Sequence, residues 1–136
     1  MHHTKRKGDI GVTKAIARLT ELNWNIGVLV TEHAPYDFFA EKDGKIDTIQ
    51  ARYTTPTNGV LQVKLSSSWA DKNGNHKRKR KKQDFTVLSV YNPEDDRVYF
   101  IRASGFNNGR AINLRLVPAA NGQKRGVRMA EDYLEL

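Results

Sequence analysis

The sequence contains no cysteine, and this absence excludes several kinds of protein at once. Without thiols the 136-residue chain can form neither a disulfide scaffold nor a thiolate zinc site, and it offers no cysteine nucleophile. Any bound metal must then be held by oxygen or histidine ligands. Folding must rest on packing alone, for which 38% apolar residues suffice in one domain of this length.

Long apolar segments are absent as well. No stretch approaches the ~20 apolar residues that cross a bilayer, and the segment from Met1 to Lys7 lacks the apolar core of a secretory signal. We therefore expect no membrane association and an intracellular location, in the cytoplasm or close to the nucleoid. Since neither a linker nor an internal repeat divides the chain, we expect residues 1–136 to form a single domain.

Acidic residues are few relative to basic ones. The 15 Asp and Glu residues stand against 23 Lys and Arg residues, which leaves a formal net charge of +8 at pH 7. This balance favours a polyanionic partner, because each Lys or Arg that docks on a phosphate releases condensed counterions. Nucleic acid is favoured over an anionic membrane surface. A basic composition is also found in proteins that bind neither, so the positions of the charges must decide.

The apolar spacing predicts one helix followed by several strands. Between Asp9 and Leu22 apolar residues recur at three- and four-residue steps, with Gly8–Asp9 as the predicted N-cap and Asn23 as the predicted stop. Turn sequences such as Lys42-Asp43-Gly44 separate the strand patterns that follow. The fold class predicted is α/β, with a mixed central sheet flanked by helices. The predicted strands cover residues 25–31, 36–40, 46–53, 60–65, 85–91, 97–101 and 112–116.

A dense run of basic residues lies in the second half of the chain. It follows Asn73-Gly74-Asn75-His76, and nothing apolar anchors it, which predicts a mobile basic loop at about residues 70–84. A phosphate backbone would relieve the repulsion within this run, so it is the leading candidate for contact with nucleic acid. The alternatives are a solubilising loop and a nuclear targeting signal. The run consists of Lys77, Arg78, Lys79, Arg80, Lys81 and Lys82.

Further basic residues are predicted to contact nucleic acid from other parts of the chain. Three of them lie at the predicted helix N-terminus, where backbone amides favour phosphate. Two others lie in or beside a Gly- and Asn-rich segment suited to base edges. One more lies on the polar face of the strand at residues 60–65, where its alternatives are a catalytic cation and an ordinary solvated lysine. In this order they are Lys5, Arg6, Lys7, Arg102, Arg110 and Lys64.

Three polar residues on neighbouring predicted strands indicate a hydrolytic site. Asp37 begins one strand, and the next strand presents Gln50-Ala51-Arg52, whose alternation puts Gln50 and Arg52 on one face. Pairing of the two strands as a hairpin would bring Asp37 close to both. Asp37 and the Gln50 side-chain carbonyl would then offer oxygen ligands to a hard cation such as Mg²⁺. Arg52 would stabilise negative charge on a phosphate or orient a water.

These elements resemble the PD-(D/E)XK nucleases, in particular the small group I intron homing endonucleases, whose fold is shared with Holliday junction resolvases. The resemblance implies sequence-specific binding of double-stranded DNA and metal-dependent hydrolysis of its phosphodiester bonds, with Mg²⁺ or alternatively Mn²⁺. It implies that Asp37 is the central metal ligand, that Gln50 is an accepted variant at the acidic ligand position, and that Arg52 takes the place of a lysine. The segments that carry it are residues 5–11, 35–37, 50–53, 58–67, 90–91, 98–99 and 121–124.

The same resemblance bears on the partners. A nearly palindromic DNA target requires symmetric subunits, so a homo-oligomer is expected, either a dimer or a tetramer. Double-stranded DNA is the expected partner, and RNA is the alternative.

Two positions depart from the family pattern. Val12 stands where the helix of the family usually carries a glutamate. Arg52 stands where the family has lysine, and the arginine side chain, unlike that of lysine, cannot give up its proton. Asp9 lies one turn before Val12 and is a candidate catalytic replacement, its alternative role being the helix N-cap. The alternative function is therefore a decayed nuclease kept as a DNA- or RNA-binding protein, in regulation, intron splicing or a ribonucleoprotein.

Overall fold

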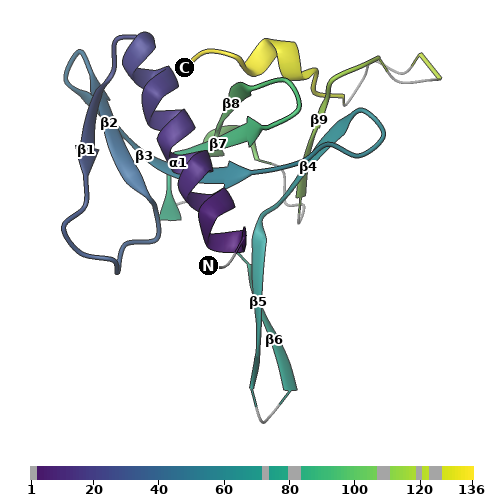
Figure 1. Ribbon diagram of the computed structural model, residues 1–136, viewed down its shortest axis with the longest axis horizontal. Coiled ribbons are helices and arrows are strands. Elements are labelled where there is room, and N and C mark those ends of the chain that lie inside the picture. Colours follow the sequence, from purple (N-terminus) through teal and green to yellow (C-terminus); the bar gives the residue numbers. More distant parts are fainter. Residues whose placement is uncertain (1–2, 72–73, 80–83, 107–110, 119–120, 123–126) are drawn as a thin grey trace.

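A five-stranded mixed sheet forms the centre of the molecule (Figure 1). Its order is β1-β2-β3-β7-β8, in which β3 and β7 are parallel and the other neighbours antiparallel. The computed structural model describes residues 3–71, 74–79, 84–106, 111–118, 121–122 and 127–136. The mixed sheet confirms the predicted α/β class. Its strands are β1 (Asn25–Val28), β2 (Phe38–Lys42), β3 (Lys45–Tyr53), β7 (Val87–Asn92) and β8 (Arg97–Arg102).

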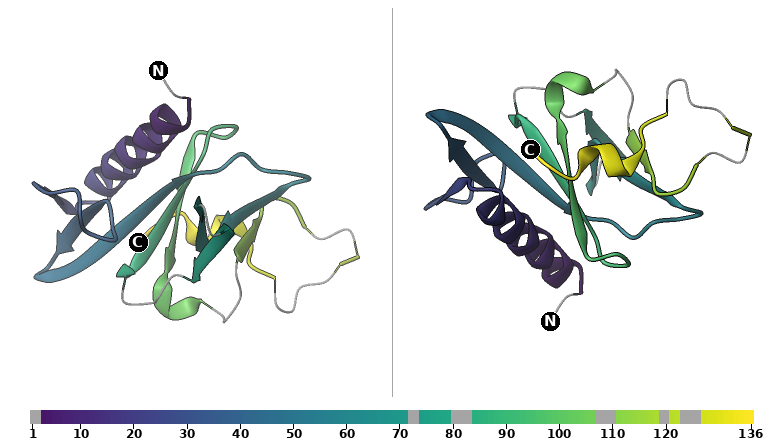
Figure 2. Two further views of the ribbon diagram at one scale, coloured as in Figure 1. Left: turned by 90° about the horizontal axis from the view of Figure 1, so that it is seen from below. Right: turned by 90° about the horizontal axis from the view of Figure 1, so that it is seen from above.

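The helix α1 (His3–Glu21) lies across one face of this sheet (Figure 2). The predicted N-cap at Gly8–Asp9 is wrong, because Asp9 lies inside the helix, where its backbone carbonyl accepts the Thr13 hydroxyl at 3.0 Å. Lysine and arginine are good helix formers, so the basic segment before Asp9 continues the helix although it carries no apolar face. Lys5, Arg6 and Lys7 therefore belong to α1.

The C-terminal end of α1 lies where the sequence predicts it. Asn23 adopts a φ of 72°, the N–H of Trp24 donates to Leu19 O at 2.9 Å, and the N–H of Asn23 donates to Thr20 O at 3.1 Å. This pair of bonds is a Schellman motif, which satisfies carbonyls at the helix end. Leu19 and Trp24 are both buried in the core between α1 and the sheet. The predicted stop at Asn23 is confirmed.

Two further strands cover the other face of the central sheet. The antiparallel pair β4 (Val60–Lys64) and β9 (Ala111–Arg115) turns alternate apolar residues inward, and these form a second core with β7 and β8. The 3₁₀ helix η3 (Ala130–Tyr133) lies on the same side, and η2 (Ala103–Gly105) follows β8. In the described part of the chain, strands and 3₁₀ turns thus take the place of a second flanking α-helix.

The predicted basic loop is largely a β-hairpin. β5 (Ser66–Asp71) pairs with β6 (Gly74–Lys79) in antiparallel register, from Ser66 opposite Lys79 to Asp71 opposite Gly74. The prediction of a loop was wrong because a backbone ladder needs no apolar side chains, so the lack of apolar residues did not exclude strands. The hairpin projects away from the rest of the molecule (Figure 1). Arg80, Lys81 and Lys82 lie outside the described residues.

The tight turn between β2 and β3 sets the register that builds the site. Asp43 and Gly44 both have positive φ, 53° and 82°, as a two-residue type I′ turn requires. Lys42 consequently pairs with Lys45, and the ladder runs to Phe38 opposite Ile49. The residue before Phe38 is Asp37, which the register places beside Gln50.

Candidate active site

The carboxylate of Asp37 continues the β2–β3 ladder beyond the end of β2. The backbone N–H of Asp37 donates to Ile49 O at 2.8 Å. Its side-chain Oδ2 accepts the backbone N–H of Ala51 at 2.8 Å and Nε2 of Gln50 at 3.2 Å. The predicted approach of Asp37 to Gln50 is therefore present in the structure. These bonds fix the carboxylate relative to β3.

The alternation of β3 places Gln50 and Arg52 on one face of the sheet. Ile49 and Ala51 belong to the core beneath α1. Gln50 pairs with Leu88 and Arg52 with Val90, and both partners on β7 belong to the core on the opposite face. Gln50 itself is only 8% exposed. Its amide is thus held in a confined position next to Asp37.

The N-terminal part of α1 brings a cation to the end of β3. The Nζ atom of Lys7 lies 5.7 Å from the centre of the Tyr53 ring, and Tyr53 directly follows Arg52. The Tyr53 ring in turn lies 5.6 Å from the ring of Tyr91 at the end of β7. Cation–π contact of this kind holds the ammonium near the strand end that carries Arg52. Lys5 and Arg6 are exposed on the same part of the helix.

A second contact ties α1 to the turn between β7 and β8. Lys14 donates to Asp96 Oδ1 at 2.8 Å, and the Tyr91 hydroxyl donates to the same oxygen at 2.8 Å. These two bonds lower the pKa of Asp96, the Lys14 bond contributing more, and the pKa of Lys14 is raised by the same partner. The contact fixes the helix relative to the strand end near the site.

The helix supplies no carboxylate at the position that the family pattern would occupy. Val12 is half-buried and packs against the core between α1 and the sheet. Asp9 is exposed one turn earlier. Among the described residues, no group of three or more His, Cys, Asp or Glu side chains is arranged to hold a metal ion. Of the predicted metal ligands and their candidate replacement, the described structure brings only Asp37 and Gln50 together.

The chemistry of these two side chains fits a hard divalent cation with few protein ligands. The Gln50 Nε2 faces Asp37 Oδ2, and a half-turn of the amide exchanges its nitrogen for its oxygen at almost no change in shape. A carboxylate and an amide oxygen can then face the same ion. Mg²⁺ commonly keeps several waters and takes one or two carboxylates together with substrate phosphates. The donor set therefore suits an ion that arrives with nucleic acid.

The remaining predicted contacts lie in different places. Lys64 is exposed on the face of β4 opposite to its core-facing neighbours Val63 and Leu65. Arg102 donates to Asp47 at 3.2 Å with its side chain 53% exposed, so an acidic partner already occupies part of its guanidinium. Arg110 lies outside the described residues. Lys77, Arg78 and Lys79 lie in β6.

Asp47 is a polar residue that the sequence analysis did not single out. It is 8% exposed, accepts the Thr86 hydroxyl at 2.8 Å and pairs with Arg102. Asp47 stands two positions before Ile49 on the face of β3 that turns toward the core. An acidic residue in the inward register of a strand is a signal of a buried pair, and it was available in the sequence.

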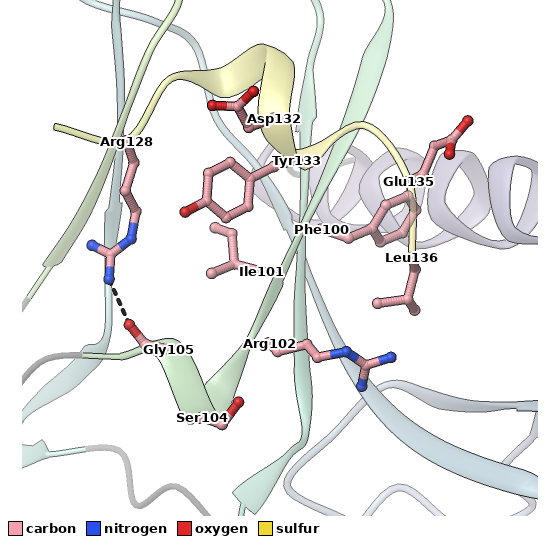
Figure 3. Close-up of a pocket in the computed structure, with 10 residues that line it drawn as sticks. All are labelled: Phe100, Ile101, Arg102, Ser104, Gly105, Arg128, Asp132, Tyr133, Glu135 and Leu136. Carbon is pink, nitrogen blue, oxygen red and sulfur yellow. Dashed lines mark hydrogen bonds between the residues drawn. The ribbon is translucent and has the colours of Figure 1, made fainter. Parts of the chain in front are cut away.

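A cavity of about 370 Å³ lies apart from the Asp37 and Gln50 pair, between β8 and the C-terminal segment (Figure 3). In it, Arg128 extends toward Gly105, whose carbonyl it contacts, while the Arg102 side chain points away from Arg128. Asp132 and Glu135 add carboxylates to its lining. Its described lining includes the predicted contact residue Arg102 but none of Asp37, Gln50 and Arg52, so this cavity does not join the candidate site.

Comparison with known proteins gives the family of this chain. The model of the PD-(D/E)XK endonuclease family matches residues 2–136. The chain belongs to the PD-(D/E)XK endonuclease family. A solved structure of similar fold is that of the bacterial homing endonuclease I-Ssp6803I, with a TM-score of 0.76 and 20% sequence identity over 97% of this chain and 88% of that chain. The comparison with curated proteins found no match.

Membership in the PD-(D/E)XK endonuclease family confirms the resemblance on which the sequence analysis relied. It identifies the chain as a nuclease whose substrate is DNA, and members of this family generally use divalent metal ions. The described part of the chain contains no helix long and apolar enough to cross a membrane.

Proposed function

We propose that this PD-(D/E)XK endonuclease binds double-stranded DNA at a specific sequence and hydrolyses phosphodiester bonds with Mg²⁺ or Mn²⁺, as a homing endonuclease does. The observation that carries the proposal is the hydrogen-bonded pair of Asp37 and Gln50 on the β2–β3 hairpin. The basic residue Arg52 follows Gln50 by two positions in β3, so it lies on the same face of the strand and supports the proposal.

Asp37 and Gln50 would hold the divalent ion, which when bound supplies Lewis-acid stabilisation of the phosphate and a more acidic water. The Ala51 N–H keeps Oδ2 of Asp37 fixed. The Asp37 carboxylate is thus preorganised, so binding of the ion need not order this side chain.

Arg52 would stabilise the negative charge that develops on the scissile phosphate. A guanidinium keeps its proton at all relevant pH values, so Arg52 acts as a fixed positive charge and not as a proton donor or acceptor. Water is the nucleophile, since the Asp37, Gln50 and Arg52 group contains no serine, threonine or cysteine. The proton that the water loses passes to solvent or to a phosphate oxygen.

The DNA would lie on the side of the molecule toward which the Asp37 segment and the basic elements extend. In Figure 1 the β1–β2 connection, the N-terminal end of α1 and the β5–β6 hairpin all extend to the lower side. The connection ends at Asp37, α1 carries Lys7, and β6 carries Lys77 to Lys79. The DNA major groove admits a two-stranded ribbon, which suits the projecting hairpin.

The proposal includes a homo-oligomer, because a nearly palindromic site is read by subunits related by the same symmetry. The protein would act inside the cell, where its DNA substrate lies. Its target sequence and subunit number would be determined together, by cleavage site mapping and by sedimentation of the complex.

Incubation with supercoiled plasmid and Mg²⁺ or Mn²⁺ tests the proposal. The wild-type chain should nick or linearise the plasmid, and Asp37→Asn should lose at least about a hundredfold in rate, as expected when a preorganised group is removed. Asp43→Asn is the matched control, because Asp43 is an exposed carboxylate in the β2–β3 turn and asparagine tolerates its positive φ.

The double variant Val12→Glu with Arg52→Lys distinguishes an active from a decayed site. If only this variant cleaves, the wild-type protein binds DNA without cutting it. Absence of cleavage in the wild type, in Asp37→Asn and in the double variant would refute the assignment of the Asp37 and Gln50 site.

A further inference from the structure

The two glycines of α1 differ sharply in their surroundings. Gly8 is exposed, and a Cβ atom added there would have nothing within 4 Å. A Cβ atom on Gly11 would lie 3.1 Å from both C and O of Arg52 and 3.4 Å from N of Tyr53. These are backbone atoms, and they lie at the site end of β3. Glycine is less favourable in a helix than alanine, so the stability of α1 does not explain a glycine at position 11. The close approach to the Arg52 backbone does.

The Arg52 backbone cannot give way easily to a larger side chain. Arg52 pairs with Val90 in the parallel ladder between β3 and β7, and β7 is in turn paired with β8. Distances near 3.1 Å are shorter than ordinary contacts between carbon atoms. A methyl group at Gly11 must therefore move either α1 or the Arg52–Tyr53 peptide.

The buried side chains on the face of α1 that packs against the sheet increase in size along the helix. Gly11, Ala15 and Leu19 follow at four-residue steps and all three are buried. Their side chains grow from the N-terminal to the C-terminal end, and the smallest of the three, Gly11, is the one that lies against the Arg52 backbone. The same part of the helix carries Lys7, whose ammonium contacts the Tyr53 ring.

We propose that Gly11 is a positioning residue for the active site, because its missing side chain lets α1 seat against the Arg52 peptide. This contact between α1 and β3 fixes the backbone of Arg52 directly. It fixes Asp37 through Ala51, whose N–H donates to Asp37 Oδ2 and which directly precedes Arg52. The proposal rests on the proposed function for the role of Arg52 in cleavage.

A comparison of Gly11→Ala with Gly8→Ala in the full chain tests this role. Both variants add the same methyl group to the same helix. Gly8→Ala should leave the single-turnover cleavage rate within about twofold, whereas Gly11→Ala should lower it about tenfold or more, since a shift below 1 Å already disturbs a catalytic arrangement. The affinity for DNA, measured with EDTA so that the proposed metal-dependent cleavage cannot proceed, should stay within about twofold in both variants, because neither substitution changes a charged side chain.

Amide hydrogen exchange supplies a readout that needs no cleavage. Gly11→Ala should accelerate exchange of the Ala51 amide, which depends on the bond to Asp37, about tenfold more than that of amides elsewhere in the five-stranded sheet. If the wild-type chain does not cleave DNA, the proposed function fails, and the exchange result still decides whether Gly11 positions the site. Uniform acceleration across the sheet, or an unchanged Ala51 amide, would overturn the positioning role. Failure of Gly11→Ala to fold would overturn it too, since Gly11 would then serve the whole fold.

Discussion

Asp37 Oδ2 accepts the backbone N–H of Ala51 at 2.8 Å, so a side chain takes over a bond that a strand backbone would otherwise make. β2 begins one residue later, at Phe38. The same carboxylate oxygen meets the Gln50 amide. One residue therefore serves both the local pairing of β3 and the proposed chemistry, and the two roles can be measured apart.

Replacing Asp37 should lower stability as well as activity. In Asp37→Ala the buried Ala51 N–H loses its acceptor, and an unsatisfied buried donor costs about 1–2 kcal/mol. Asp37→Asn keeps an acceptor oxygen and should lose less of the free energy of unfolding. Urea denaturation of the two variants provides the measurement, and equal losses in both would argue against the bond as the cause.

Removing a buried hydroxyl from β7 should stabilise the protein. Ser89 is 1% exposed, and its Oγ has no hydrogen-bond partner within the described structure. Because an unpaired buried polar group is unfavourable, Ser89→Ala should raise the free energy of unfolding by about 1 kcal/mol. Ser104→Ala, at an exposed serine of η2, should change it by less than about 0.5 kcal/mol. A destabilised Ser89→Ala protein would show that the hydroxyl is satisfied.

Alkaline pH should destabilise the folded state through Tyr99. Burial and the hydrogen bond to Asp95 raise the pKa of Tyr99 to about 12, from an ordinary value of 10.0. The unfolded chain ionises first, so stability that is fully present below pH 10 is lost as the pH rises toward 12. Urea midpoints measured across this range should fall more steeply for the wild type than for Tyr99→Phe. The same steepness in both proteins would exclude Tyr99 as the titrating group.

The β5–β6 hairpin should account for part of the salt dependence of DNA binding. Each phosphate contact contributes about 0.9 to the slope of log K against log salt, so Lys77→Ala should make that slope shallower by this amount. The combined replacement of Lys77, Arg78 and Lys79 should remove about 2.7. Lys45→Ala is the control, because Lys45 is exposed at the start of β3, next to the β2–β3 turn, which lies on the upper side of Figure 1. Binding isotherms at several salt concentrations measure the slopes, and equal slopes for the control and the hairpin variants would remove the hairpin from the interface.

Elements with a strong local signal could be predicted from the sequence. The Asp43–Gly44 turn and the alternation of residues 46–53 fixed the hairpin, and with it the meeting of Asp37 and Gln50. The end of α1 at Asn23 was equally visible, because asparagine tolerates positive φ. In each case the residues that decide the structure lie close together in the chain.

Features that show no apolar period, or that depend on distant partners, could not be predicted in the same way. The start of α1 was misplaced because charged helix formers carry no apolar period, so nothing marked them as helical. The close approach of Gly11 to Arg52 joins residues far apart in the chain, and a lone glycine gives no sign of its neighbour. The β5–β6 hairpin was missed since its pairing rests on the backbone and not on apolar alternation.

The topology of the hairpin also bears on how such a protein can change its target. β5 and β6 form a separate two-stranded sheet within the long connection between the parallel strands β3 and β7. Leu65 before it and Phe85 after it are both buried, and they anchor the two ends of the connection. We therefore expect this protein to tolerate changes in the length and sequence of the segment between them, or its replacement by a segment of another nuclease, while the frame that holds Asp37 stays the same.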